Sequence, residues 1–207
     1  GQVLDELERT GLAEKSVVVV WGDHGWKLGD HSSWSKHTNL ECDTRVPLMV
    51  RVPGKAKTEA TNSLIELIDL YPTLCELTGV APPIQCQGKS FAALLDNPDA
   101  EHREAAFSSY PAEEGVSERE ASGMIDASHR RTTAMGIGYS IRFDDYRYTE
   151  WRVDESSAPV AAVLTNLALD PGEQTNLINS AEHATTLSSA KAMLGQRIHV
   201  ASPELAR

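Results

Sequence analysis

A run of five apolar residues, Val17–Trp21, constrains the fold of this chain more than any other feature. Five consecutive β-formers without polar alternation are typical of a strand that is buried on both faces of a parallel sheet. An amphipathic segment over residues 2–10, closed by Gly11, precedes this run and predicts a helix. Helix, short loop and buried strand make up half of an α/β unit. We therefore predict an α/β fold with this strand inside its sheet.

The pattern changes along the chain from α/β to antiparallel. In the first half we expect strands over 46–52 and 64–68, a helix that begins at Asp69 and ends at Gly79, and a helical turn over 91–95.

In the second half, alternating residues at 139–143 and 146–151 flank Asp144-Asp145 and predict a hairpin. A turn at 170–173 and an amphipathic helix over 181–198 follow.

Charge and apolar content exclude several classes of protein. The 207 residues include 19 basic and 30 acidic side chains, and the formal charge of −11 argues against a nucleic-acid binder with a basic face. No apolar run exceeds five residues, so we predict no membrane-spanning helix. The acid excess falls on residues 61–207, so residues 1–60 are where an anionic substrate could approach. The three cysteines form neither a metal motif nor a disulfide framework.

The polar segment after the apolar run, Gly22–Asn39, holds the residues that carry chemistry. Asp23 and His24 could bind one divalent cation through a carboxylate oxygen and a ring nitrogen. Lys36 could hold one oxygen of a tetrahedral anion. Two ligands are too few for a metal site, so others would have to come from elsewhere. In the alternative interpretation Asp23 caps a turn and Lys36 is a solvated lysine, so the residues alone indicate an α/β domain with a candidate metal and anion site.

Five blocks of the sequence resemble, in order, the formylglycine-dependent sulfatases, and the first block looks closest to the iduronate-2-sulfatase branch. The blocks are VVVVWGDHGWKLGDHSSWSKHTNLECDTRVPLMVRVPG, SLIELIDLYPTLCELTGV, QGKSFAALL, MGIGYSIRFDDYRYTEW and LALDPGEQTNL. The resemblance implies the C-terminal part of an alkaline-phosphatase-like sulfatase fold over residues 1–107. It also implies a small subdomain over 108–207, with antiparallel strands, a terminal helix and a polar insertion near 112–133.

The resemblance assigns roles to five residues. Asp23 and His24 match the family's second pair of metal ligands, which usually bind calcium. Lys36 matches the catalytic lysine that contacts the sulfate group. Trp26 matches a position that lines the substrate pocket, and His37, which follows the catalytic lysine, is expected to face the same pocket.

The sequence also departs from the family pattern. The family's nucleophile is a formylglycine made from the Cys or Ser of a C-x-[PA]-x-R element, and no such element occurs here. The family's first metal-ligand pair is absent as well. Relatives often have Gly at the position of Ser32 and a small apolar residue at that of Asp43. We interpret the chain as the C-terminal portion of a sulfatase, with the formylglycine in a preceding segment, and expect the chain to be inactive by itself.

The expected function is hydrolysis of a sulfate ester, with a sulfated carbohydrate as the partner and with neither nucleic acid nor membrane span involved. A related metal-dependent phosphoesterase or phosphonate hydrolase is the first alternative, and a non-catalytic truncated module is the second. The resemblance implies an exported protein, periplasmic or extracellular, or a lysosomal one. The residues do not indicate the oligomeric state.

Overall fold

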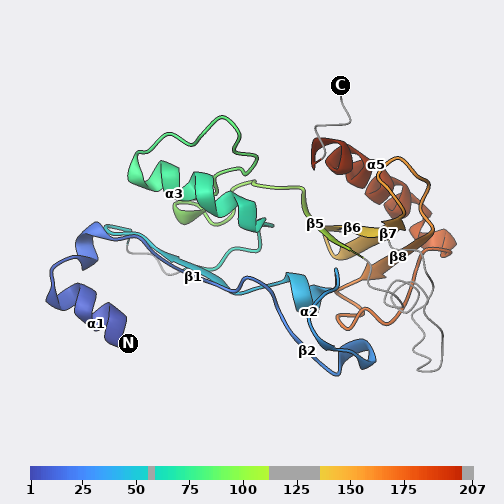
Figure 1. The fold of residues 1–207 in the computed structure, drawn as a ribbon, viewed down its shortest axis with the longest axis horizontal. Coiled ribbons are helices and arrows are strands. Elements are labelled where there is room, and N and C mark those ends of the chain that lie inside the picture. Colours follow the sequence, from blue (N-terminus) through green and yellow to red (C-terminus); the bar gives the residue numbers. More distant parts are fainter. Residues whose placement is uncertain (56–58, 112–135, 202–207) are drawn as a thin grey trace. The chain divides into compact units, whose positions relative to one another are not determined.

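The computed structural model describes residues 1–55, 59–111 and 136–201 (Figure 1). The chain groups into two compact units. The first contains Gly1–Asp23 and Val46–Arg103, and the second contains His24–Arg45 and Glu104–Arg207. The polar insertion predicted near 112–133 lies outside the described residues. The domain boundary predicted between residues 107 and 108 stays a prediction.

The first unit begins with helix α1 (Gln2–Arg9), which confirms the predicted N-terminal helix. Gly11 ends it in the left-handed conformation, at φ +67°. The Gly11 N–H donates to the carbonyl of Glu8 and the Leu12 N–H to that of Leu7. These two bonds satisfy carbonyls that the helix end leaves without partners.

Strand β1 (Val18–Trp21) pairs with β4 (Leu48–Arg51), and the prediction of a parallel strand buried on both faces is wrong for the described residues. The pairing is antiparallel, with Val19 opposite Val50. Val20 and Trp21 are each 52% exposed. An apolar run sets the strand, but its burial depends on elements that must cover it, and these two strands form a two-stranded sheet.

The strand predicted over 64–68 is also wrong, because the chain turns there into a helix. The short 3₁₀ helix η3 (Leu67–Asp69) leads directly into α3 (Leu70–Thr78). The Asp69 carboxylate accepts the Glu66 N–H at 3.0 Å and closes this turn. Helix α3 ends at Gly79 and the helical turn η4 covers Ala92–Leu95, both as predicted. The first unit also contains the 3₁₀ turn η1 (Ala13–Lys15).

The second unit is built on a four-stranded antiparallel sheet in the order β5-β6-β7-β8. Its strands are β5 (Ala105–Pro111), β6 (Ile137–Phe143), β7 (Tyr146–Arg152) and β8 (Ala161–Asn166). The predicted hairpin is confirmed, since Phe143 pairs with Tyr146 and leaves a two-residue turn. The turn at 170–173 is confirmed by the bond from the Glu173 N–H to the Asp170 carbonyl.

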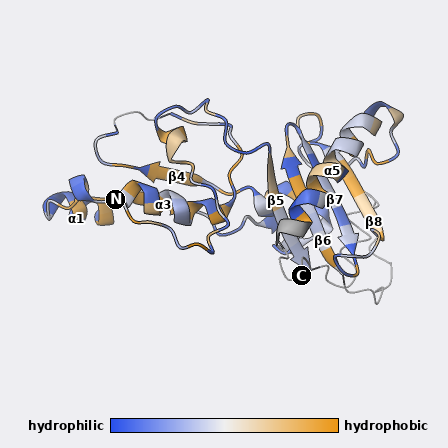
Figure 2. Ribbon diagram, turned by 90° about the horizontal axis from the view of Figure 1, so that it is seen from above, coloured by the Kyte–Doolittle hydropathy of each residue, from blue (hydrophilic) through white to orange (hydrophobic). Residues whose placement is uncertain are grey.

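Helix α5 (Ala184–Ala201), preceded by η5 (Ala181–His183), packs on one face of this sheet (Figure 1). This confirms the predicted terminal helix. Alternate residues of each strand face the helix and form the core, which also shows as apolar colour on β8 (Figure 2). The buried core residues are Tyr139, Ile141, Phe143, Tyr148, Leu164, Ala190, Leu194 and Ile198.

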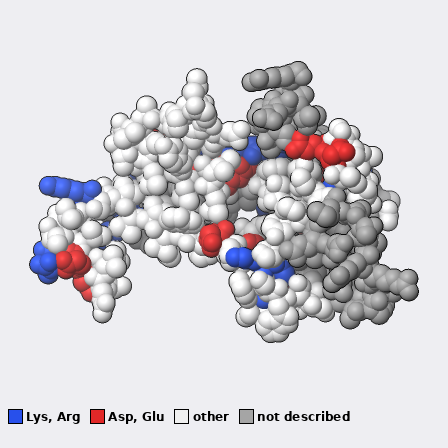
Figure 3. Space-filling model, viewed as in Figure 1, with Lys and Arg blue, Asp and Glu red and all other residues white. Residues whose placement is uncertain are grey.

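The opposite face of the sheet is polar, and residues 24–45 lie against it. This segment, the site loop, contains β2 (Lys27–Leu28), η2 (Asp30–Ser32), β3 (Trp34–Ser35) and α2 (Glu41–Thr44). On the face drawn in Figure 3, the described charged side chains lie in small groups of either sign. Among the described helices, none is both long and apolar enough to cross a membrane.

Candidate functional site

The site loop is folded back on itself by backbone hydrogen bonds near its two ends. The Gly25 N–H donates to the Asp43 carbonyl and the Trp26 N–H to the Cys42 carbonyl. A Cβ at Gly25 would lie 1.9 Å from the Cys42 carbonyl oxygen, so only glycine allows this approach. The start of the loop is therefore fixed against α2.

A buried ion pair holds the middle of the loop. Lys27 is fully buried and its ammonium pairs with Asp43. The same Asp43 oxygen accepts the Thr38 N–H at 3.0 Å and the Thr38 hydroxyl at 2.5 Å. Asp43 thus joins three parts of the loop.

Lys36 and His24 meet at the centre of the loop. The Lys36 Nζ lies 2.5 Å from the His24 Nε2, and the His24 Nδ1 lies 2.7 Å from the Gly25 carbonyl oxygen. These contacts assign the imidazole proton to Nδ1, because only a protonated nitrogen can donate to a carbonyl. The Nε2 lone pair then faces a cationic group. A metal-binding histidine takes the same form, in which one nitrogen donates to a carbonyl and the other faces the cation.

The backbone on both sides of Lys36 is strained. Ser35 has φ +77° and His37 has φ +94°, while His31 and Ser32 lie at +51° and +52°. Residues with a Cβ disfavour these conformations, which persist where the surroundings hold them. Four of the six described non-glycine residues with positive φ fall within this stretch of the loop. Such clustering is typical of functional sites.

The two residues predicted to contact the substrate, Trp26 and His37, have different neighbours. Trp26 is 52% exposed, with its ring centroid 6.1 Å from that of His24. The His37 ring stacks on Tyr110 of β5 at 5.5 Å. Asp23 belongs to the first unit, so the predicted cleft shared by its side chain with His24 and Lys36 stays a prediction.

Cys42 is the loop's cysteine, and its environment opposes nucleophilic chemistry. Burial raises the pKa of the thiol to about 12, with a further contribution from the Asp43 carboxylate. At neutral pH the reactive thiolate form is therefore negligible.

Charged and polar side chains attach the loop to the sheet, an arrangement that no sequence pattern predicted. The Arg147 guanidinium pairs with Glu41, and its Nε lies 3.1 Å from the Glu173 Oε1. The Glu173 Oε2 accepts the Glu41 N–H at 2.6 Å, and Asn39 donates to the Gly138 carbonyl at 3.2 Å. Burial raises the pKa of Glu173 above its usual value, although the Arg147 charge opposes the shift.

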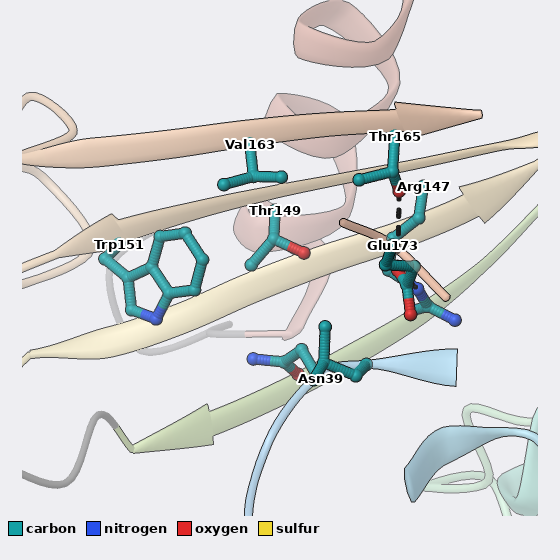
Figure 4. Close-up of a pocket in the computed structure, with 8 residues that line it drawn as sticks. Asn39, Arg147, Thr149, Trp151, Val163, Thr165 and Glu173 are labelled. Atoms are coloured by element: carbon teal, nitrogen blue, oxygen red, sulfur yellow. Dashed lines mark hydrogen bonds and ion pairs between the residues drawn. The ribbon is translucent and has the colours of Figure 1, made fainter. Parts of the chain in front are cut away.

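Figure 4 shows the small pocket that remains between loop and sheet. Arg147 and Glu173 lie at one end of it, Trp151 lies at the other, and Asn39 reaches in from the loop. Sequence patterns identify residues 170–173 as a turn, and the turn does form. Its glutamate contacts a residue 132 positions away, which no local pattern encodes.

Residues 1–80 of the chain match the family model described as Sulfatase. Over 92% of the chain, the sequence is 29% identical to the iduronate 2-sulfatase of Mus musculus.

Residues 1–80 are thus similar to a sulfatase domain.

Two solved structures match nearly the whole chain. A 2-O GAG sulfatase has a TM-score of 0.75 at 25% identity over 99% of this chain. A phosphonate monoester hydrolase from Silicibacter pomeroyi has a TM-score of 0.74 at 25% identity over 96% of it. The predicted fold class is thus confirmed as part of an alkaline-phosphatase-like sulfatase fold that includes a small antiparallel sheet and a helix.

The chain spans 43% of the mouse enzyme and 40% and 38% of the two solved chains. It thus covers less than half of each of these relatives. The family match does not assign roles to individual side chains, so the roles of Asp23, His24, Trp26, Lys36 and His37 stay predictions.

Proposed function

We propose that the whole protein hydrolyses a sulfate ester of a sugar or glycan. The observation that carries this proposal is the position of Lys36, whose ammonium lies 2.5 Å from the His24 Nε2 in the strained loop of a sulfatase domain. The printed names of the mouse iduronate 2-sulfatase and of the 2-O GAG sulfatase support a sulfated sugar as substrate class.

In this proposal Lys36 binds a sulfuryl oxygen. An ammonium is a compact point charge, and it stabilises the negative charge that shifts among the oxygens as the ester bond breaks. The strained residues beside it hold the ammonium in place before substrate arrives, so no reorganisation is needed during the reaction. Trp26 and His37 would contact the sugar.

A divalent cation, calcium in the family, would be bound by Asp23 and His24 and would supply further positive charge to the sulfate oxygens. The donor chemistry fits half of such a site, because the His24 Nε2 is a lone-pair donor that faces a cation in the structure. The described residues hold no group of three or more His, Cys, Asp or Glu side chains able to bind a metal. The other ligands would have to come from outside these residues.

The nucleophile would also have to come from outside the 207 residues. The sequence has no C-x-[PA]-x-R element from which a formylglycine could be made. The high pKa of Cys42 excludes it as a substitute at neutral pH.

A phosphonate monoester hydrolase is the second candidate, favoured by the TM-score of 0.74 to such an enzyme. A sulfate ester and a phosphonate monoester both present a tetrahedral anionic centre, which Lys36 could bind in the same way. A non-catalytic module is the third candidate, and export or lysosomal targeting of the whole protein is proposed from the family resemblance.

Turnover of two matched aryl esters by the whole protein separates these candidates. We expect turnover of the aryl sulfate to exceed that of the aryl phosphonate by at least about a hundredfold in kcat/KM, a difference of roughly 2.7 kcal/mol. Faster hydrolysis of the phosphonate would favour the second candidate. Hydrolysis of neither ester, with the divalent metal bound, would favour the non-catalytic one.

A further inference from the structure

The ring of charged groups that attaches the site loop to the sheet has a role beyond packing. We propose that Glu41, Arg147 and Glu173 act together as positioning residues, which fix the site loop, and Lys36 with it, against the polar face of the sheet. This proposal rests on the function proposed above, because it explains how the same loop is held in its working geometry.

The three side chains close a ring that joins three separate segments. Glu41 lies in α2 of the loop, Arg147 in β7 and Glu173 in the turn after β8. The Arg147 guanidinium pairs with Glu41 and lies 3.1 Å from Glu173, which in turn accepts the Glu41 N–H. A planar guanidinium holds two carboxylates at fixed angles, so the ring fixes direction as well as distance.

The ring contributes position more than stability. Its Arg147 and Glu173 side chains are only 5% and 3% exposed. Buried ion pairs of this kind often stabilise a fold no better than apolar residues of similar size. Glu173 also has φ +52°, which is unfavourable for a residue with a Cβ. These unfavourable features make sense if the ring selects one placement of the loop.

The chain segment that connects Glu41 of the ring to Lys36 is short, and hydrogen bonds restrict its movement. Four residues separate Lys36 from Glu41, and two of those four are fixed by hydrogen bonds. Thr38 is bonded to Asp43, and Asn39 bonds both the Gly138 carbonyl and the Ser108 hydroxyl. A shift of α2 would therefore move the Lys36 ammonium.

A second ion pair on the same strand provides a matched control. The Arg152 Nε lies 2.6 Å from the Glu150 Oε1, and Arg152 also donates to the carbonyls of Glu155 and Ser157. These partners all lie outside the site loop. Arg152→Met thus removes a comparable guanidinium from β7 without touching the ring.

Hydrogen exchange in the whole protein tests the proposal. In Arg147→Met and Glu41→Gln we expect the amides of residues 25–43 to exchange at least about tenfold faster, while those of β6–β8 are unchanged. Arg152→Met should leave loop exchange unchanged. Glu41 lies on the loop, so Glu41→Gln still gives an answer if Arg147→Met fails to fold.

The activity of Glu41→Gln gives a second readout. We expect kcat for the aryl sulfate to fall by about ten- to a hundredfold at a temperature where the variant is fully folded, because a displaced group loses its alignment. Unchanged loop exchange in Glu41→Gln, or equal acceleration in loop and sheet, would overturn the proposal. If the whole protein hydrolyses no sulfate ester, the proposed function fails, and the exchange result still decides whether the ring fixes the loop.

Discussion

Ser32 shows how a single backbone angle connects the sequence to the site. It is exposed and has φ +52°, a conformation that favours glycine. Gly avoids a left-handed cost of about 1–2 kcal/mol but increases the entropy of the unfolded chain by about 0.4–1 kcal/mol. We therefore predict that Ser32→Gly raises the free energy of unfolding by about 0.5–1 kcal/mol in urea titrations.

The neighbouring serine is the control for this prediction. Ser33 has φ −122°, an extended conformation that any residue adopts. Ser33→Gly should lower the free energy of unfolding, because glycine then brings only its entropy cost. Equal destabilisation by both substitutions would mean that Ser32 is not strained.

The surroundings of Asp69 allow a prediction of how acid changes the stability of the first unit. Burial opposes its ionisation, but hydrogen bonds from Arg103 and from the Lys89 and Glu66 N–H groups outweigh this and hold the pKa of Asp69 below its usual value. A carboxyl with a lowered folded-state pKa stabilises the fold fully above its unfolded pKa of about 3.9. That stabilisation is lost as the pH falls from there through the folded pKa.

We predict that Asp69→Asn lowers the free energy of unfolding by about 3–5 kcal/mol at pH 7 and flattens its fall below pH 4. Asp96→Asn, which removes a largely exposed partner of Lys55, should cost at most about 1 kcal/mol. Urea titrations between pH 7 and pH 3 measure both. An acid response of Asp69→Asn as steep as that of the unaltered chain would contradict the assignment.

At the scale of elements, sequence patterns correctly predicted the helices and the hairpin that form through contacts between residues close in the sequence. The hairpin was predictable because Phe143 and Tyr146 pair across a two-residue turn, and α5 because Ala190, Leu194 and Ile198 repeat at helical spacing. Helix α1 was predictable from its amphipathic pattern and from Gly11 at its end.

The wrong predictions concern segments whose structure depends on residues that are distant in the sequence. The strand expected over 64–68 is displaced by the bonds that Asp69 makes with Glu66, Lys89 and Arg103. The burial of β1 was overestimated, because it depends on which elements cover the strand. In the site, the positions of His24 and Lys36 along one loop were visible in the sequence, but the Arg147 and Glu173 contacts were not.

At the scale of the whole chain, the first unit exposes apolar sheet surface. Val20 and Trp21 are each 52% exposed and Met49 is 61% exposed. Exposed apolar patches and strand edges favour association. We predict that the 207-residue chain, purified by itself, self-associates and shows no calcium-dependent aryl sulfatase activity.

Light scattering after size exclusion and an aryl sulfate assay measure these two properties. Val20→Lys should reduce the association, because it places a charge on the exposed face. A monodisperse chain with calcium-dependent turnover well above background would contradict both parts of the prediction.

The central claim, that Lys36 binds the sulfate group, is tested most directly by the turnover of Lys36→Ala in the whole protein. The account predicts that kcat/KM for an aryl sulfate falls by at least about 10²–10³-fold, the effect of removing one positioned charge donor. The melting temperature should change little, because a lysine on a loop buries little apolar area. Near-normal turnover by Lys36→Ala would contradict the claim and leave Lys36 as a structural partner of His24.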